Sequence, residues 1–162
     1  MTDKTLEIIK DIHGKILGVD FGDKRTGLAV CDKNRIIASG IGQISVGGMQ
    51  RTAAHICGLI KQEGITGGIV VGLPINMDGS HGPRAEHAEK FARILGEMLA
   101  EDESTAKLPI VMLDERMTTM VAARYLNETD TRGAKRKQVI DTLSAQIILQ
   151  NALDRLKNMA QT

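Results

Sequence analysis

The amino-acid sequence predicts an α/β protein in which helices cover both faces of one sheet. Two apolar runs at residues 16–19 and 28–31 flank a basic turn bracketed by glycines, and this pattern predicts a β-hairpin. Two further apolar runs, at residues 68–73 and 108–113, have the length and composition of parallel strands buried on both faces. Segments with apolar residues at helical spacing separate these runs and follow them.

The elements expected along the chain are, in order, a short helix within residues 1–14, hairpin strands at 16–20 and 28–31, a strand at 34–41 after a turn at 32–34, a helix at about 50–62, a strand at 68–73, a helix at about 83–100, a strand at 108–113, a short helix from Thr118 or Thr119 to Asn127, and a final helix at about 137–159. Gly47 and Gly48 break the chain before the first long helix, and Pro83 suits the first turn of the second. A right-handed crossover through the first long helix makes the first and fourth strands parallel.

A chain of 162 residues is long enough for one domain with a single core. We expect that domain at residues 15–162, with residues 1–14 as an N-terminal appendage that places Leu6, Ile9 and Ile12 on one side of its helix. No apolar run is long enough to span a membrane, and the N-terminal segment lacks a signal-type core. A cytoplasmic protein is therefore expected.

Charge and aromatic content restrict the kinds of partner. The formal net charge is +1, so a polyanionic partner would have to meet a local cationic patch. Phe21, Phe91 and Tyr125 are too few for a platform on which several bases stack, so any contact with nucleic acid is expected to be with its backbone. Cys31 and Cys57 lack metal-ligand spacing and are expected to be buried, reduced thiols.

Three acids stand where a carboxylate needs a partner. Asp20 ends the first strand and Glu115 follows the fifth, and sites in open α/β sheets lie at the carboxyl ends of parallel strands. Asp141 heads a stripe on the final helix that is otherwise apolar at the spacing i+4, i+7 and i+11. The three acids are therefore expected to converge.

Each acid also has an ordinary explanation. Asp20 could pair with Lys24 or Arg25, Glu115 with the arginine that follows it or with water, and Asp141 could complement the positive end of its helix. Converging acids without matched bases repel one another, however, and Mg²⁺ or Mn²⁺ would remove that repulsion. Two such ions about 4 Å apart can activate water and stabilise the leaving oxygen in phosphodiester cleavage. The four histidines show no zinc-ligand spacing.

Four sequence blocks occur in order, at residues 19–27 (VDFGDKRTG), 71–79 (VGLPINMDG), 114–119 (DERMTT) and 141–149 (DTLSAQIIL). Together they resemble the YqgF family, also called RuvX. The resemblance implies an RNase H-like three-layer fold with a five-stranded mixed sheet of order 3-2-1-4-5, in which strand 2 is antiparallel and helices cover both faces. It also implies kinship with the RuvC Holliday junction resolvases, with Asp20, Glu115 and Asp141 as catalytic acids and metal ligands.

The chain departs from RuvC-type resolvases at Gly72, where those enzymes carry an acid at the end of the fourth strand. The Asp-Glu-Arg motif after the fifth strand is expected to supply a substitute. Residues 76–79 predict a turn in which Asp78 is a further candidate ligand. The candidates for phosphate contacts are Lys24, Arg25, Arg116, Arg132, Lys135, Arg136 and Lys137. The last four form a basic cluster around Gly133, within residues 129–137, a segment that is expected to be mobile.

The leading hypothesis is a metal-dependent endonuclease that acts on structured nucleic acid and processes the 5′ end of pre-16S rRNA. One alternative is a Holliday junction resolvase, which cuts two strands of branched DNA and needs a dimer. The others are a noncatalytic nucleic-acid-binding or partner-binding protein, and an actin or hexokinase-type nucleotide-binding protein, which would need two such domains. The expected partner is pre-rRNA or branched DNA, with no membrane, and the chain is expected to act as a monomer or homodimer.

Overall fold

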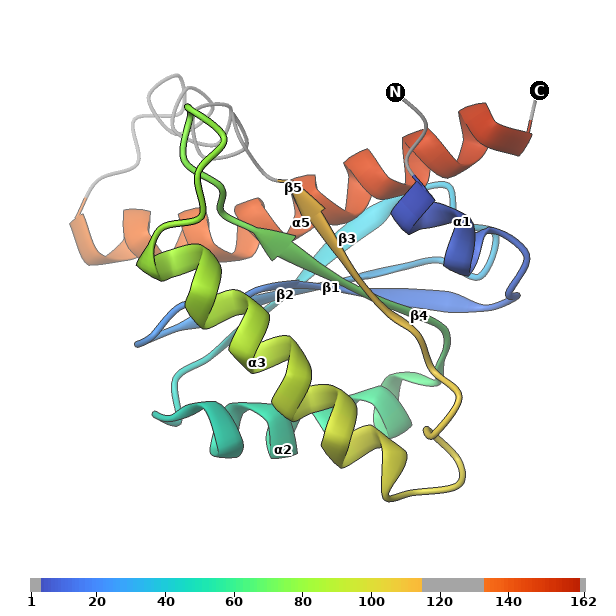
Figure 1. The fold of residues 1–162 in the computed structure, drawn as a ribbon, viewed down its shortest axis with the longest axis horizontal. Helices are drawn as coiled ribbons and strands as arrows, with labels where there is room; N and C mark the ends of the chain where they lie inside the picture. The colour runs from blue at the N-terminus through green and yellow to red at the C-terminus, as the bar shows by residue number, and fades with distance from the viewer. Residues whose placement is uncertain (1–3, 115–132, 161–162) are drawn as a thin grey trace.

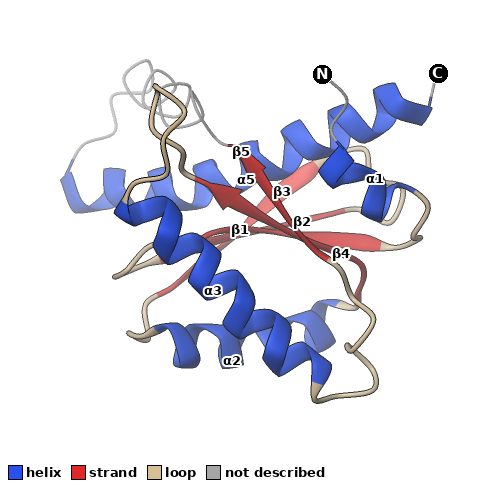
Figure 2. Cartoon of the chain, viewed as in Figure 1, coloured by secondary structure: helices blue, strands red, loops and turns tan. Residues whose placement is uncertain are grey.

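The structure is a computed structural model of the chain that describes residues 4–114 and 133–160. Its elements are α1 (Lys4–Lys10), β1 (Lys15–Asp20), β2 (Thr26–Cys31), β3 (Ala38–Ile44), α2 (Met49–Glu63), β4 (Ile65–Leu73), α3 (Pro83–Ala100), β5 (Ile110–Asp114) and α5 (Gly133–Ala160) (Figures 1 and 2). The short helix expected before Asn127 lies outside the described residues. No helix in the two described ranges is long and apolar enough to cross a membrane.

The five strands form one mixed sheet in the predicted order β3-β2-β1-β4-β5. Strand β2 runs antiparallel to β1 and β3, whereas β4 is parallel to both β1 and β5. The carboxyl ends of β1, β4 and β5 therefore meet at the same edge of the sheet. The turn between β1 and β2 and the beginnings of α3 and α5 lie on that side of the molecule (Figure 1).

Each face of the sheet has its own hydrophobic core, as expected for three layers. Helices α1 and α5 pack on one face, where Ile16 and Val70 are buried. Helices α2 and α3 cover the other, where Leu17 and Val19 are buried (Figure 1). Successive side chains of β1 enter opposite cores, Ile16 the first and Leu17 and Val19 the second, so the strand is buried on both faces.

Small residues let α5 lie close to the sheet. Gly18, Ala29 and Gly40 are paired in a row across β1, β2 and β3. A Cβ atom on Gly18 would come within 2.8 Å of the Cβ of Leu149, and one on Gly40 within 2.5 Å of the Cγ2 of Thr142. This row therefore fixes where α5 crosses the strands.

Strand β3 begins at Ala38, four residues later than predicted. The Asp32 carboxylate accepts hydrogen bonds from the backbone N–H groups of Asn34 (3.1 Å), Ile36 (2.8 Å) and Ile37 (2.8 Å). These bonds extend the turn well past residue 34, so the prediction of a strand from that residue is wrong.

The segment expected to be an appendage contributes to the core. Leu6 and Ile9 of α1 are fully buried in the cluster that contains α5. The Arg35 guanidinium donates hydrogen bonds to the carbonyl oxygens of Ile9, Ile12 and Gly14. These contacts hold the end of α1 against the turn between β2 and β3.

Helix α5 begins at Gly133, four residues before the predicted start. The residues that follow, alanine, lysine, arginine and glutamine, are strong helix formers, so the helix extends beyond its apolar stripe. Residues 133–137 of the segment expected to be mobile form the start of this helix, and residues 129–132 lie outside the described residues. Both cysteines are free, as expected; Cys31 is buried and Cys57 is half-buried.

Candidate nuclease site

Asp20 is the last residue of β1 and is half-buried at the carboxyl edge of the sheet. Two residues earlier, Gly18 faces α5, since an added Cβ would meet Leu149 and the carbonyl oxygen of Ala145. Side chains of a strand alternate between faces, so Asp20 lies on the same face as Gly18. The first predicted acid is therefore positioned on the face covered by α5.

The backbone of Asp141 is level with this acid. From Ala38 to Gly40, the contacts of β3 move back along α5 from Gln150 towards Thr142, so α5 runs antiparallel to β3 and β1. Two residues of a strand span about 6.6 Å and four residues of a helix about 6 Å. A step from Gly18 to Asp20 thus corresponds to a step from Ala145 back to Asp141.

Strand β4, the parallel neighbour of β1 at this edge, contains no acidic residue. Val19 pairs with Val71, so Gly72 of β4 is the next neighbour of Asp20 in the register. Val70 is buried in the core shared with α5, and alternation puts Gly72 on that same face. The expected difference from RuvC-type resolvases therefore falls directly beside the first acid.

Several of the predicted site residues are described only in part or not at all. Glu115, Arg116 and Arg132 lie outside the described residues, as do the side chains of Asp141, Lys135, Arg136 and Lys137. Among the side chains that are described, no three His, Cys, Asp or Glu residues converge on a possible metal site. The structure thus places Asp20 on the face covered by α5, the helix that contains Asp141.

The turn between β1 and β2 presents the two predicted phosphate-binding cations. Lys24 is exposed and Arg25 is half-buried. A Cβ on Gly22 would come too close to the carbonyl oxygen of Arg25, so the tight turn requires glycine at this position. Asp20 and Arg25 both interact with neighbouring groups in the protein. The turn therefore places positive charge at the same edge as the acid.

Asp78 belongs to a turn that its own side chain stabilises. Its Oδ1 accepts hydrogen bonds from the backbone N–H of Ser80 at 2.9 Å and from the Ser80 hydroxyl at 2.6 Å. The Ser80 bonds lower the pKa of Asp78. The predicted turn at 76–79 is confirmed, and Asp78 has a structural role in it.

Three contacts near the carboxyl edge of the sheet are not predicted from the sequence. His81 Nδ1 lies 2.7 Å from Glu89 Oε1, and His87 Nδ1 lies 3.2 Å from Asp23 Oδ1. The Ser45 hydroxyl donates to the carbonyl oxygen of Lys24 at 3.2 Å. The last two pairs are 64 and 21 residues apart, so no local pattern indicates them.

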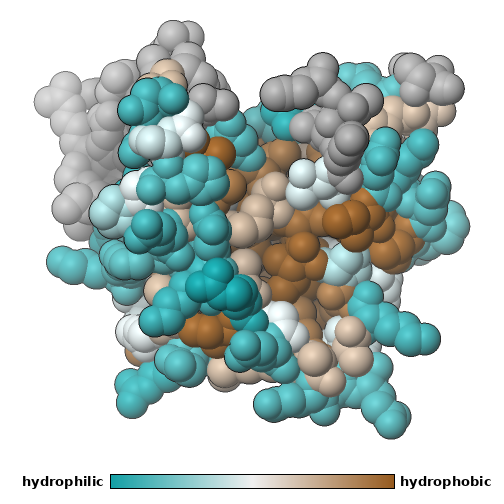
Figure 3. All heavy atoms as spheres, in the orientation of Figure 1, coloured by the Kyte–Doolittle hydropathy of each residue, from teal (hydrophilic) through white to brown (hydrophobic). Residues whose placement is uncertain are grey.

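An apolar groove lies elsewhere. It has a volume of about 440 Å³ between α3 and β5, and its lining includes Gly96, Ile110 and Met112. The apolar surface around β5 is visible in Figure 3. Of the candidate residues whose side chains are described, Asp20, Lys24 and Arg25 do not line this groove.

Sequence comparisons agree on one family. The family model described as "RuvX: Holliday junction resolvase" matches residues 14–155. A protein of Pelotomaculum thermopropionicum named "Putative pre-16S rRNA nuclease" is 45% identical over 141 residues, covering 86% of both chains. A Bradyrhizobium protein (strain ORS 278) of the same name is 40% identical over 150 residues, covering 93% of this chain and 88% of the relative.

Solved structures share the fold at low sequence identity. Thermus thermophilus RuvC in complex with a Holliday junction substrate superposes with a TM-score of 0.54 at 14% identity, covering 88% of this chain and 96% of RuvC. The yeast mitochondrial Holliday junction resolvase superposes with a TM-score of 0.50 at 12% identity, covering 97% of this chain and 88% of that one. The fold is therefore RNase H-like, as the resemblance implied.

Proposed function

This chain belongs to the RuvX family, and we propose that it is a nuclease that hydrolyses phosphodiester bonds in structured nucleic acid, with pre-16S rRNA as its substrate. The relatives that support the rRNA substrate are 40–45% identical and align with 86–93% of this chain. The proposal is supported by the position of Asp20 at the carboxyl edge of the sheet, on the face covered by α5, the helix that contains Asp141.

Asp20, Glu115 and Asp141 would hold the divalent ion that this chemistry requires. All three supply carboxylate oxygens, the ligand type that Mg²⁺ and Mn²⁺ prefer, and Asp20 is half-buried at the edge. Such an ion activates water and stabilises charge on the leaving oxygen. The site has glycine at position 72, so the acid pair contributed by β1 and α5 needs a third ligand from the residues after β5.

Cationic side chains would hold the substrate backbone across the acids. Lys24 and Arg25 stand on the turn that follows Asp20, and phosphate contacts there would fix the strand without reading its sequence. We assign the same role to Arg116, Arg132, Lys135, Arg136 and Lys137. The scarcity of aromatic residues agrees with backbone recognition, since the chain cannot stack several bases.

The test compares two substrates, a pre-16S rRNA leader and a four-way DNA junction, each with and without Mn²⁺. The expected result is Mn²⁺-dependent cleavage of the leader that Glu115→Gln abolishes. Cleavage of the junction alone would favour the resolvase function that the family description names. Cleavage of neither substrate, or equal cleavage by Glu115→Gln, would contradict the proposal.

A further inference from the structure

The chain's two phenylalanines stack on each other next to the candidate catalytic acid. The rings of Phe21 and Phe91 have centroids 4.4 Å apart and planes inclined by 14°. Both side chains are buried, and Phe21 follows Asp20 directly in the chain. The backbone that carries the acid is therefore anchored to α3, on the face of the sheet opposite α5.

A second contact joins the same two elements. His87 precedes Phe91 by one helical turn, and its Nδ1 lies 3.2 Å from the Oδ1 of Asp23, two residues after Phe21. Helix α3 therefore holds the turn at two points, through the Phe21–Phe91 stack and the Asp23–His87 contact.

A third contact joins the turn between β1 and β2 to the end of β3. The Ser45 hydroxyl at the end of β3 donates to the carbonyl oxygen of Lys24, the residue after Asp23. The turn that bears Lys24 and Arg25 is consequently tied to both α3 and β3. The contacts all involve backbone or side chains of residues 21–24, which immediately follow the acid.

We propose that α3 aligns the catalytic edge, with His87 and Phe91 as positioning residues that act on Asp20 and on the phosphate-binding turn through Asp23 and Phe21. The inference rests on the proposed nuclease function. A carboxylate that binds a catalytic ion must be held within a fraction of an ångström, because misplacement by about 1 Å can cost about 100-fold in rate. An exposed histidine-carboxylate pair adds little to stability, so the value of the His87 contact lies in alignment.

The experiment compares His87→Ala with His81→Ala. The control removes a second histidine-carboxylate pair at the start of α3, in which His81, from the loop before the helix, contacts Glu89 of α3. His87→Gln keeps a side chain that can donate to Asp23 and serves as the conservative rescue. Each full-length variant is measured by amide hydrogen exchange over residues 21–25, and by kcat and KM on the substrate that the wild type cleaves.

His87→Ala is expected to raise exchange over residues 21–25 about threefold and to lower kcat about 3–10-fold, with KM changed less than about twofold. His81→Ala should change neither quantity, and His87→Gln should recover most of the rate. Equal exchange in the two alanine variants, or raised exchange with an unchanged kcat, would overturn the inference. A wild-type chain that cleaves no substrate would refute the proposed function instead, and the exchange comparison alone would then decide whether α3 aligns the turn.

Discussion

At the scale of single residues, Gly18 shows how the sheet fixes the position of its covering helix. Its missing side chain leaves room for Leu149 and for the backbone at Ala145. The acid at position 20 and the helix bearing Asp141 face each other only because this crossing is close. A glycine inside an apolar strand costs conformational entropy, and here the cost is offset by the approach of α5.

Gly18→Ala should destabilise the protein by about 1–3 kcal/mol, because the new methyl group overpacks against α5. Urea unfolding measures the change. The matched control is Gly58→Ala in the exposed face of α2, where an added Cβ meets nothing within 4 Å. That substitution should be neutral or stabilising by up to about 1 kcal/mol. A Gly18→Ala protein as stable as the wild type would mean that α5 does not depend on this contact.

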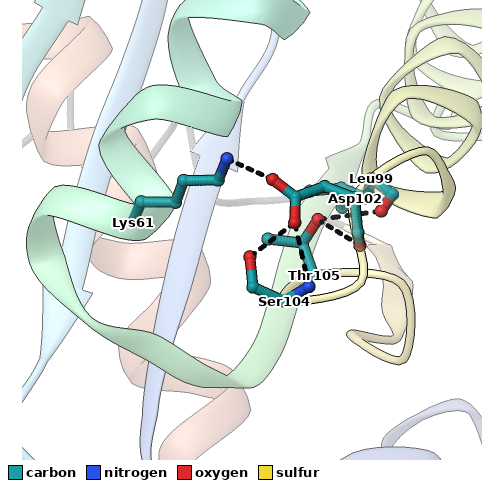
Figure 4. Close-up of polar contacts among 5 residues, drawn as sticks. All are labelled: Lys61, Leu99, Asp102, Ser104 and Thr105. Atoms are coloured by element: carbon teal, nitrogen blue, oxygen red, sulfur yellow. Dashed lines mark hydrogen bonds and ion pairs between the residues drawn. The ribbon is translucent and has the colours of Figure 1, made fainter.

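At the scale of elements, the ends of α2 and α3 are joined by one ionic cluster. Lys61 of α2 forms an ion pair with Asp102, which follows α3 (Figure 4). Asp102 also accepts hydrogen bonds from the backbone N–H (2.9 Å) and hydroxyl (2.8 Å) of Ser104. The Lys61 contact first, and then the Ser104 bonds, lower the pKa of Asp102 from 3.8 to about 2.

The pKa of Asp102 predicts a stability change in acid. Since the pKa is lower in the folded chain, the unfolded chain binds this proton more tightly. The stabilising contribution is therefore complete above about pH 4 and is lost as the pH falls from about 4 to 2. Asp102→Asn should flatten the pH dependence of the thermal midpoint in that window, and Lys61→Met should flatten it in part. An unaltered pH profile in Asp102→Asn would contradict the assignment.

The sequence predicted most elements because their signals are local. The buried run at 68–73 and the apolar stripe of the last helix need no long-range information, and β4 and α5 contain both. The start of β3 was harder to predict, because the sequence allows turns of several lengths here. Hydrogen bonds from the backbone N–H groups of Ile36 and Ile37 to the Asp32 carboxylate stabilise the longer turn. The burial of α1 likewise depends on packing against α5, at the other end of the described chain.

At the scale of the whole molecule, the carboxyl ends of β1, β4 and β5 meet at one edge of the sheet, where Asp20 lies on the face covered by α5. Alternation and helical periodicity predict that Asp20 and Asp141 approach each other; the structure places Asp20 on the face that α5 covers, and the Asp141 side chain lies outside the described residues. The support from α3 could not be predicted, since the His87 and Phe91 contacts join segments more than 60 residues apart. Neither residue belongs to a local motif that marks it.

We propose that Asp20 and Asp141 bind a divalent ion together. Calorimetric titration of the intact protein with Mn²⁺ tests this, with the site variants Asp20→Asn and Asp141→Asn and with the turn variant Asp78→Asn as the control. We expect binding by the wild type and the control, and affinity at least about tenfold weaker in each site variant, with their circular dichroism spectra unchanged. Wild-type affinity in the Asp20→Asn, Asp141→Asn double variant would contradict it.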